Sequence, residues 1–250
     1  MIEIEDHGRV RVLKLARPPV NALNRELITR LESAVTAAPK DGARGIVLTG
    51  AGGRFCAGLD VQEILSLDGP GLEDFLRGFF SCLKCLANSS IPIAAAINGH
   101  CPAAGAVLAL YCDRRVMAEG DYRIGLNEVQ VGLFPGAMIH AVLARTVGAR
   151  VAADLLPAGS LLDAHAALEV GFVHELVPLA QVERAARAWL ERMLALPPTV
   201  YAQTRALVRA DLVAIMAAIG AAEVVAGAAE WRSPESLATL RAVLAKLSRR

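Results

Sequence analysis

The sequence lacks an excess of charge of either sign. Its 26 Lys and Arg residues face 25 Asp and Glu residues, and the formal net charge is +1. The basic side chains are scattered along the chain, so no basic patch indicates a nucleic acid or an anionic membrane as a partner. A phosphate-bearing ligand could therefore be bound only by individual basic residues near its site.

Long hydrophobic runs are also absent, although 54% of the residues are hydrophobic. No apolar run reaches the roughly 18 residues that a membrane span needs, and the apolar segment 212–222 is bracketed by Asp211 and Glu223. The first residues, MIEIEDHGRV, are too acidic and too polar for a signal peptide. We therefore expect a soluble, cytoplasmic protein with no membrane partner, long enough at 250 residues to bury a sizeable core.

The cysteines show no spacing that is typical of a disulfide framework. Their count is odd, and free buried thiols are the expected state. Cys82-x-x-Cys85 resembles half of a zinc site, but no second ligand pair exists and both residues lie in a helical pattern. We therefore predict no metal. The cysteines are Cys56, Cys82, Cys85, Cys101 and Cys112.

A dinucleotide-binding loop is excluded as well. Gly50-Ala51-Gly52-Gly53 follows an apolar run, as the glycines of such a loop do. The last glycine of the fingerprint is replaced by Phe55, however, and no helix is predicted to begin there. We therefore expect no cofactor.

What the sequence does contain is an alternation of strand and helix patterns. Short apolar runs predict strands over residues 2–5, 9–13, 45–49, 91–97, 115–117 and 171–177. Helical periodicity predicts helices after Asn24, over 74–87, from about 103, over 137–147, 149–156 and 163–169, from 182 to Pro197, onward to about 229, and after Ser233. Residues 129–136 are predicted to form a loop. This alternation indicates βα units.

One stretch, residues 97–132, combines the features of a reactive site. Asn98-Gly99-His100-Cys101-Pro102 cannot continue a regular element, and residues 103–106 have side chains small enough for a ligand to press against the backbone. A helix that starts near Ala103 directs its unpaired N–H groups outward, where they suit an anion or an anionic transition state. The turn therefore predicts a site that stabilises negative charge.

Glu128, in the same stretch, is preceded by the apolar segment Ile124-Gly125-Leu126. Burial in such surroundings raises the pKa of a carboxyl group into the range of a useful base. The alternative is that the glycine-containing turn is only a turn and that the isolated glutamate is a surface residue. The residues by themselves leave both interpretations open.

Three motifs, in this order along the chain, resemble those of the crotonase (enoyl-CoA hydratase/isomerase) superfamily. Their residues are most similar to those of its Δ3,Δ2-enoyl-CoA isomerases. They are FCAGLD at 55–60, NGHCPAAGAVLALYCD at 98–113 and IGLNEVQVG at 124–132. The resemblance runs from Pro18-Pro19-Val20-Asn21-Ala22-Leu23 to about Pro178, and more loosely to the end. It implies an α/β fold with two parts: a ClpP-like crotonase spiral of ββα units over residues 1–195 and a C-terminal helical trimerisation region over residues 196–250.

The resemblance also implies roles for individual residues. Glu128 matches the catalytic glutamate, and the N–H groups of Leu59 and Ala104 match the pair that forms the oxyanion hole. Ala104 stands where the family usually has glycine, so its methyl group is brought close to the thioester. Val107 stands where the enoyl-CoA hydratases carry a second glutamate.

An acyl-CoA thioester is the substrate that the resemblance implies. In crotonases, the segment matching residues 56–60 lies along the thioester and the pantetheine. Residues 19–22 are expected to offer backbone carbonyls to the adenine, although proline replaces the family's basic residue there. Asp60 is expected to order the binding loop, and Asp113 to be structural. The implied substrate-binding residues are Pro19, Val20, Ala22, Cys56, Ala57, Gly58, Asp60 and Val107.

Glu128 and Val107 together favour one reaction within the superfamily. Addition of water across a double bond needs paired carboxylates, whereas moving the bond from C3 to C2 needs a single base. The sequence therefore predicts a Δ3,Δ2-enoyl-CoA isomerase. The resemblance further implies a place in fatty-acid β-oxidation and assembly as a homotrimer or a dimer of trimers. Two alternatives stay open: another crotonase reaction, such as hydration, thioester hydrolysis or dehalogenation, and a non-catalytic homologue that binds acyl-CoA.

Overall fold

A six-stranded sheet forms the centre of the computed structural model, which describes residues 1–247. β1 and β2 form the predicted antiparallel hairpin, and every later strand joins in parallel in the order β1-β2-β3-β4-β6-β9. The strands are β1 (Ile2–His7), β2 (Val10–Leu15), β3 (Gly45–Gly50), β4 (Ile93–Ile97), β6 (Arg114–Ala118) and β9 (Glu175–Val177). Residues 248–250, the end of the predicted C-terminal region, lie outside the described residues.

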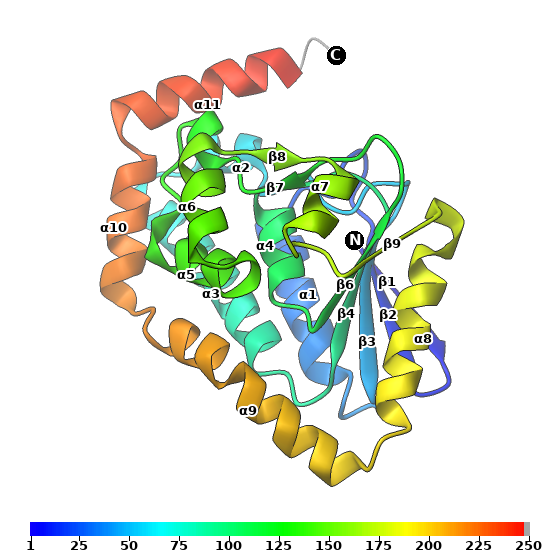
Figure 1. Cartoon of the computed structure of the whole chain (residues 1–250). Helices are drawn as coiled ribbons and strands as arrows, with labels where there is room; N and C mark the ends of the chain where they lie inside the picture. The colour runs from blue at the N-terminus through cyan, green and yellow to red at the C-terminus, as the bar shows by residue number, and fades with distance from the viewer. Residues whose placement is uncertain (248–250) are drawn as a thin grey trace.

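Side chains alternate along these strands and so divide the sheet into two faces. Leu13 and Leu15 pack in the main hydrophobic core, whereas Val10 and Val12 pack on the opposite face. Both faces are covered, which is why the parallel strands contain near-continuous apolar runs. The helices of the main core include α1 (Arg25–Ala37), α3 (Gly69–Ala87) and α4 (Ala104–Leu110), and α8 (Val182–Leu194) covers the other face. Figure 1 shows α8 on the side of the sheet opposite to α1 and α3.

A second, three-stranded sheet carries the central turn. β5 (Cys101–Pro102) pairs in parallel with β7 (Ile124–Gly125), which pairs antiparallel with β8 (Leu161–Leu162). β5 leads directly into α4, and β7 leads directly to Glu128. The pairing therefore places the turn and the segment that carries the glutamate side by side.

The first helices follow the sequence patterns with two corrections. An unpredicted helix, α2 (Val61–Ser66), forms because the Asp60 carboxylate accepts hydrogen bonds from the N–H groups of Gln62 and Glu63. α3 begins at Gly69, earlier than the predicted 74, and the side chain of Asp68 caps its first turn. Both corrections are local capping effects that apolar periodicity does not show.

Two further predictions were wrong in detail. The loop expected over 129–136 begins with a 3₁₀ turn, η1 (Glu128–Val131). The long helical stretch expected to about 229 is two helices, α9 (Pro198–Ala217) and α10 (Ala221–Trp231), which are separated at Gly220. α9 ends with Ala218 as its C-cap, and Gly220 is the N-cap of α10, a position where glycine is common. The remaining helices are α5 (Gly136–Val147), α6 (Ala149–Ala158), α7 (Ala164–Glu169), η2 (Leu179–Gln181) and α11 (Pro234–Leu247).

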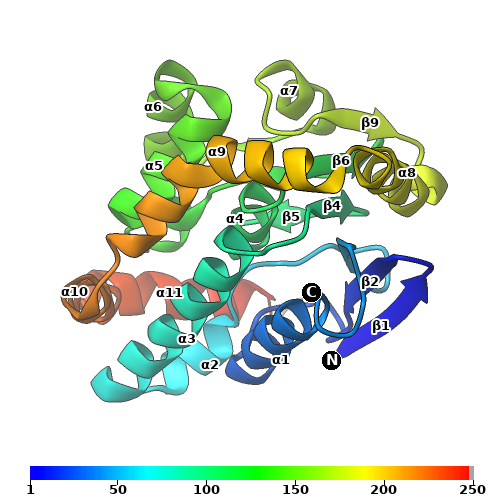
Figure 2. The same cartoon turned by 90° about the horizontal axis from the view of Figure 1, so that it is seen from below.

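The C-terminal helices wrap around the outer side of α3 (Figure 2). α9 and α10 pack on α3, and α11 packs on α2. Leu212, Val224 and Leu240, one from each of these helices, are buried in the main core. Within residues 1–247, no single helix is long and apolar enough to cross a bilayer, and α9 and α10 meet that test only as a pair bent by 65°.

A buried charge network anchors α9 to the end of α4. Asp113 accepts hydrogen bonds from Arg205 at 2.9 Å and from Arg209 at 3.1 Å, and also from the N–H of Ile93 at 2.8 Å. Arg209 donates in addition to three backbone carbonyl oxygens near the ends of α3 and α4. Asp113 therefore has a structural role, because its charge balances two buried guanidinium groups.

Asp113→Ala is expected to lower the free energy of unfolding by about 3–5 kcal/mol, because it leaves two buried arginines without their counter-charge. Urea denaturation followed by circular dichroism would measure the change. Asp154→Ala is the control, because its ion pair with Arg150 is exposed and 4.0 Å long, and such pairs contribute less than about 1 kcal/mol. Equal midpoints for the two variants would contradict the anchoring role.

Candidate active site

The loop over residues 56–60 lies against the first turn of α4. A Cβ atom added to Gly105 would lie 2.3 Å from the carbonyl oxygen of Cys56. One added to Gly58 would lie 3.1 Å from the Cβ atom of Ala103 and 3.6 Å from the backbone nitrogen of Ala104. Only glycine at position 105 permits this approach. Two segments that the sequence assigned to one site are thus in contact.

Ala103 takes a backbone conformation that favours glycine, with φ at 49°. Its N–H donates to the carbonyl oxygen of Gly125 at 2.8 Å, so pairing with β7 holds it there. Such conformations cost about 1–3 kcal/mol and persist where the surroundings impose them, often at functional sites. The strained residue places the N–H of Ala104 at the start of α4, where the helix offers it no acceptor.

Leu59 is held by a parallel bridge to Leu23. The N–H of Leu23 donates to the carbonyl oxygen of Gly58 at 2.8 Å, and the N–H of Asp60 donates to that of Leu23 at 3.0 Å. In such a bridge the N–H of Leu59 points away from Leu23. Neither Leu59 nor Ala104 donates a backbone hydrogen bond to any residue from 1 to 247. Both N–H groups thus lack a backbone acceptor within these residues, and their role in an oxyanion hole stays a prediction.

Glu128 is buried, with 8% of its surface exposed. Loss of hydration on burial raises the pKa of this carboxyl group to about 7. Its Oε2 atom has no hydrogen-bond partner within the described part of the chain. The surface position that the sequence left open is therefore wrong, and the residue has the protonation behaviour of a base that works near neutral pH.

Val107 lies in α4 and is almost completely buried. It offers neither a carboxylate nor a hydrogen bond to water. The cysteines are free, and burial raises the pKa of the Cys56 and Cys112 thiols to about 12, so neither is a reactive thiolate. Among residues 1–247, no group of three or more His, Cys, Asp or Glu side chains could hold a metal.

Asn21 and Arg17, which the sequence reasoning did not single out, hold the binding loop in place. The Asn21 amide donates to the carbonyl oxygens of Ala51 at 3.0 Å and Arg54 at 2.8 Å, and its Oδ1 accepts from the N–H of Arg17 at 3.0 Å. Arg17 also forms a 2.6 Å ion pair with Asp60, which agrees with the ordering role expected of that carboxylate. An asparagine shortly after two prolines could have indicated a turn residue at this position in the sequence. Asparagine tolerates a positive φ, and the φ of Asn21 is 54°.

The other predicted substrate-binding residues lie beside the same loop. The N–H of Ala57 donates to the carbonyl oxygen of Val20 at 3.1 Å, and Arg17 donates to that of Ala22 at 3.1 Å. Pro19 is exposed next to them. Segments 17–23 and 56–60 are therefore hydrogen-bonded to each other, with Cys56 buried and Ala57 exposed, and the adenine contacts stay a prediction.

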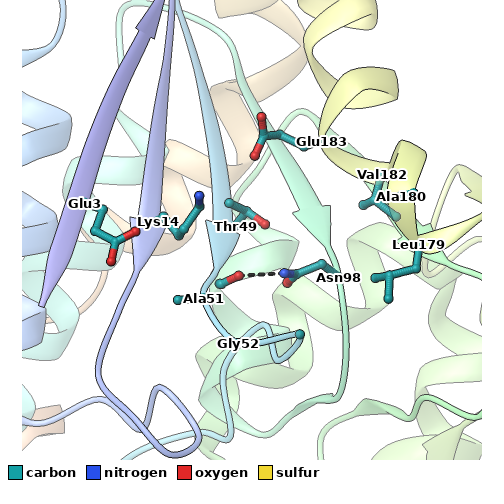
Figure 3. A pocket seen from close by; sticks show the side chains of 12 residues that line it. Glu3, Lys14, Thr49, Ala51, Gly52, Asn98, Leu179, Ala180, Val182 and Glu183 are labelled. Atoms are coloured by element: carbon teal, nitrogen blue, oxygen red, sulfur yellow. Dashed lines mark hydrogen bonds between the residues drawn. The ribbon is translucent and has the colours of Figure 1, made fainter.

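A polar hollow of about 510 Å³ lies elsewhere, at the carboxyl ends of β2, β3 and β4 (Figure 3). Lys14, Thr49 and Asn98 line it from the sheet, and Glu3 and Glu183 add carboxylates. The predicted catalytic residues are not among its lining residues. Its walls carry charges of both signs, and it is not the candidate active site.

Known proteins resemble this chain in sequence and in fold. The model of the enoyl-CoA hydratase/isomerase family matches residues 5–225. The mitochondrial enoyl-CoA delta isomerase 1 of Homo sapiens is 34% identical over 212 residues, which cover 84% of this chain and 70% of the human protein. A crystal structure of human mitochondrial delta3-delta2-enoyl-CoA isomerase superposes with a TM-score of 0.95 at 30% identity and covers 99% of this chain and 98% of that one.

A relative with a different name is similarly close. A protein of Thermus thermophilus, whose name assigns it provisionally to the enoyl-CoA hydratases, is 34% identical over 215 residues, or 84% of each chain. The fold is thus the crotonase fold that the sequence predicted, and the protein is an enzyme of the crotonase family. The chain belongs to the enoyl-CoA hydratase/isomerase family.

Burial of Glu128 predicts a particular dependence of stability on pH. Between about pH 4.5 and pH 7 the folded protein binds more protons at this carboxyl group than the unfolded chain does, so its contribution to the free energy of unfolding falls as pH rises. Glu128→Gln removes that contribution. The variant is expected to gain up to about 3 kcal/mol over the wild type between pH 4 and pH 8.

Denaturant midpoints of both proteins at pH 4 and pH 8 would measure this gain. Glu191→Gln, an exposed carboxylate on α8, is the control and is expected to leave the difference between the two pH values unchanged. A Glu128→Gln variant with the pH dependence of the wild type would contradict a desolvated carboxylate.

Proposed function

We propose that this protein is a Δ3,Δ2-enoyl-CoA isomerase that converts a 3-enoyl-CoA into the 2-trans-enoyl-CoA. The observation that carries the proposal is the buried carboxylate of Glu128, the one buried carboxylate among the described residues. Val107 stands where, by the resemblance, the hydratases of the family carry a second one. The similarity to the human isomerase supports it over most of the chain.

In this proposal, Glu128 performs both proton transfers. As a carboxylate it takes a proton from C2, which is acidic because it lies next to the thioester carbonyl. As a carboxylic acid it returns that proton to C4 of the dienolate, so the double bond moves while no atom is gained or lost. A pKa of about 7 suits both steps near neutral pH, since neither protonation state is strongly disfavoured.

The backbone has the complementary task. Negative charge develops on the thioester oxygen when C2 loses its proton. The N–H groups of Leu59 and Ala104 are proposed to donate hydrogen bonds to that oxygen. Loss of one such donor typically costs about 3 kcal/mol of transition-state stabilisation. The contact between loop 56–60 and α4 therefore matters as much as the carboxylate.

Val107 makes the site selective for isomerisation. Hydration requires groups that hold and deprotonate a water molecule, and a buried valine holds none. Exclusion of water also strengthens the electrostatic contacts of the remaining groups, because the local dielectric constant is lower. Valine in place of a second glutamate thus removes the competing hydration and favours isomerisation.

Hydration of a 2-enoyl-CoA is the second candidate, and the relatives that are named as hydratases favour it. The two reactions have different products from one substrate. A water-dependent 3-hydroxyacyl-CoA from crotonyl-CoA would support hydration, whereas a conjugated 2-enoyl-CoA from 3-enoyl-CoA would support isomerisation.

A homotrimer or a dimer of trimers remains our proposal for the assembly. Its support is the outer face of α9, where Val200, Leu207 and Val208 are exposed. Apolar side chains gathered on one helix face are typical of surfaces that other chains cover.

Purified protein is expected to convert 3-enoyl-CoA into conjugated 2-enoyl-CoA, measured by the ultraviolet absorbance of the conjugated thioester. Glu128→Gln is expected to lower kcat by at least about a thousandfold, because no other base is positioned to move the proton. Glu191→Gln is the matched control and should keep full activity. A Glu128→Gln variant as fast as the wild type would remove the mechanism.

The pH profile tests the ionisation of the same group. Because the base must be deprotonated in the free enzyme, kcat/KM is expected to rise with pH and to level off above about 7. Initial rates between pH 5 and pH 9 would define this limb. A limb centred near 4.5 would instead indicate a hydrated carboxylate and contradict the dry site.

A further inference from the structure

Two adjacent residues at the junction of α10 and α11 donate hydrogen bonds to two separate segments. The indole N–H of Trp231 donates to the carbonyl oxygen of Phe134 at 3.1 Å. The guanidinium group of Arg232 donates to the carbonyl oxygen of Leu67. Both side chains are half-buried, and Trp231 also packs against the main core.

These two carbonyls belong to the opposite halves of the candidate site. Phe134 lies in the loop that begins at Glu128. Leu67 ends α2, the helix that Asp60 starts directly after the predicted oxyanion donor. Among the hydrogen bonds of residues 1–247, none runs directly between 61–67 and 128–135. The junction is therefore bonded to both segments, which are not bonded to each other.

α11 strengthens this link, because it packs on both α2 and η1. The Ser233 hydroxyl accepts from the N–H of Ser236, which starts α11 immediately after the junction, as the sequence predicted. Leu240 is completely buried, and a Cβ atom added to Gly132 would lie 2.6 Å from that of Thr239. The helix is thus seated on the loop that follows Glu128 without room for a side chain at Gly132.

We propose that Trp231 and Arg232 are positioning residues that hold the Glu128 segment and the oxyanion loop at the separation a bound acyl thioester requires. The inference rests on the proposed function and extends it to residues that do not touch the reacting atoms. Loss of these bonds lets the two halves move relative to each other. A displacement of about 1 Å can lower turnover about a hundredfold even when the substrate still binds.

Three substitutions separate the contributions of the junction. Trp231→Phe keeps an aromatic ring and removes the N–H donor, and Arg232→Gln shortens the side chain and removes its charge. Arg232→Lys retains a charged donor and tests for rescue. The matched control is Arg241→Gln, because Arg241 is exposed on α11 and has no hydrogen bond or ion pair within the described residues.

The double variant Trp231→Phe/Arg232→Gln is expected to lower kcat with 3-enoyl-CoA by about tenfold to a hundredfold while KM stays within about twofold. The second double variant, Trp231→Phe/Arg232→Lys, keeps a charged donor at position 232 and should therefore recover part of the loss. A fall in kcat/KM caused by KM alone, or equal rates for the first double variant and Arg241→Gln, would overturn the positioning role.

Hydrogen exchange on the intact, substrate-free proteins gives a readout that does not depend on any reaction. The variant Trp231→Phe/Arg232→Gln should exchange faster than Arg241→Gln in residues 61–67 and 128–135, and at the same rate in α1 and α8. Unchanged exchange in both segments would overturn the inference, and so would an equal increase throughout the chain. If the wild type fails to isomerise 3-enoyl-CoA, the proposed function falls, and the exchange experiment still decides whether the junction holds the two segments.

Discussion

The close contact between the Cys56 carbonyl and Gly105 is the constraint on which the site depends. A hydrogen atom at position 105 is all that fits there, since an added Cβ atom would lie 2.3 Å from that oxygen. This contact brings loop 56–60, which contains Leu59, onto the first turn of α4, which begins at Ala104. It also explains the run of small residues before Val107, because larger side chains would separate the loop from the helix.

The candidate site contains features that lower the free energy of unfolding, and the rest of the fold must offset them. Ala103 has a positive φ, and Glu128 is buried with an unpaired oxygen atom. Each feature costs stability and provides something a reaction could use, namely an N–H at a helix start with no backbone acceptor within residues 1–247, and a carboxylate with a raised pKa. The extensive core beneath, with fully buried strands such as β3 and β4, offsets these costs.

The C-terminal helices belong to this same arrangement rather than forming a separate appendage to it. α9 is anchored by the ion pairs of Asp113 at the end of α4, and α11 is seated on α2 and η1 after the α10–α11 junction. The chain thus returns to α4 and to both halves of the candidate site. Residues far from the motifs in sequence therefore bear on the geometry of the motifs.

The sequence by itself determined the elements whose signals are local. The hairpin of β1 and β2, the cap at Asn24 and the start of α4 near Ala103 each follow from periodicity or from a single capping residue. The motifs around Leu59, Ala104 and Glu128 also pointed to the family, since their order and wording are specific. What remained open was whether Glu128 is buried.

Only the tertiary structure decided that burial, the hydrogen bonds of Asn21, and the place where the last helices return to the site. The carboxylate of Glu128 is desolvated by burial. The contacts made around its segment, β5 with β7 and α11 with η1, join residues that are distant in sequence. Periodicity reports which face of an element is apolar, but it does not report what covers that face. The residues of the candidate site could therefore be predicted from the sequence, while their ionisation and spacing are properties of the folded protein.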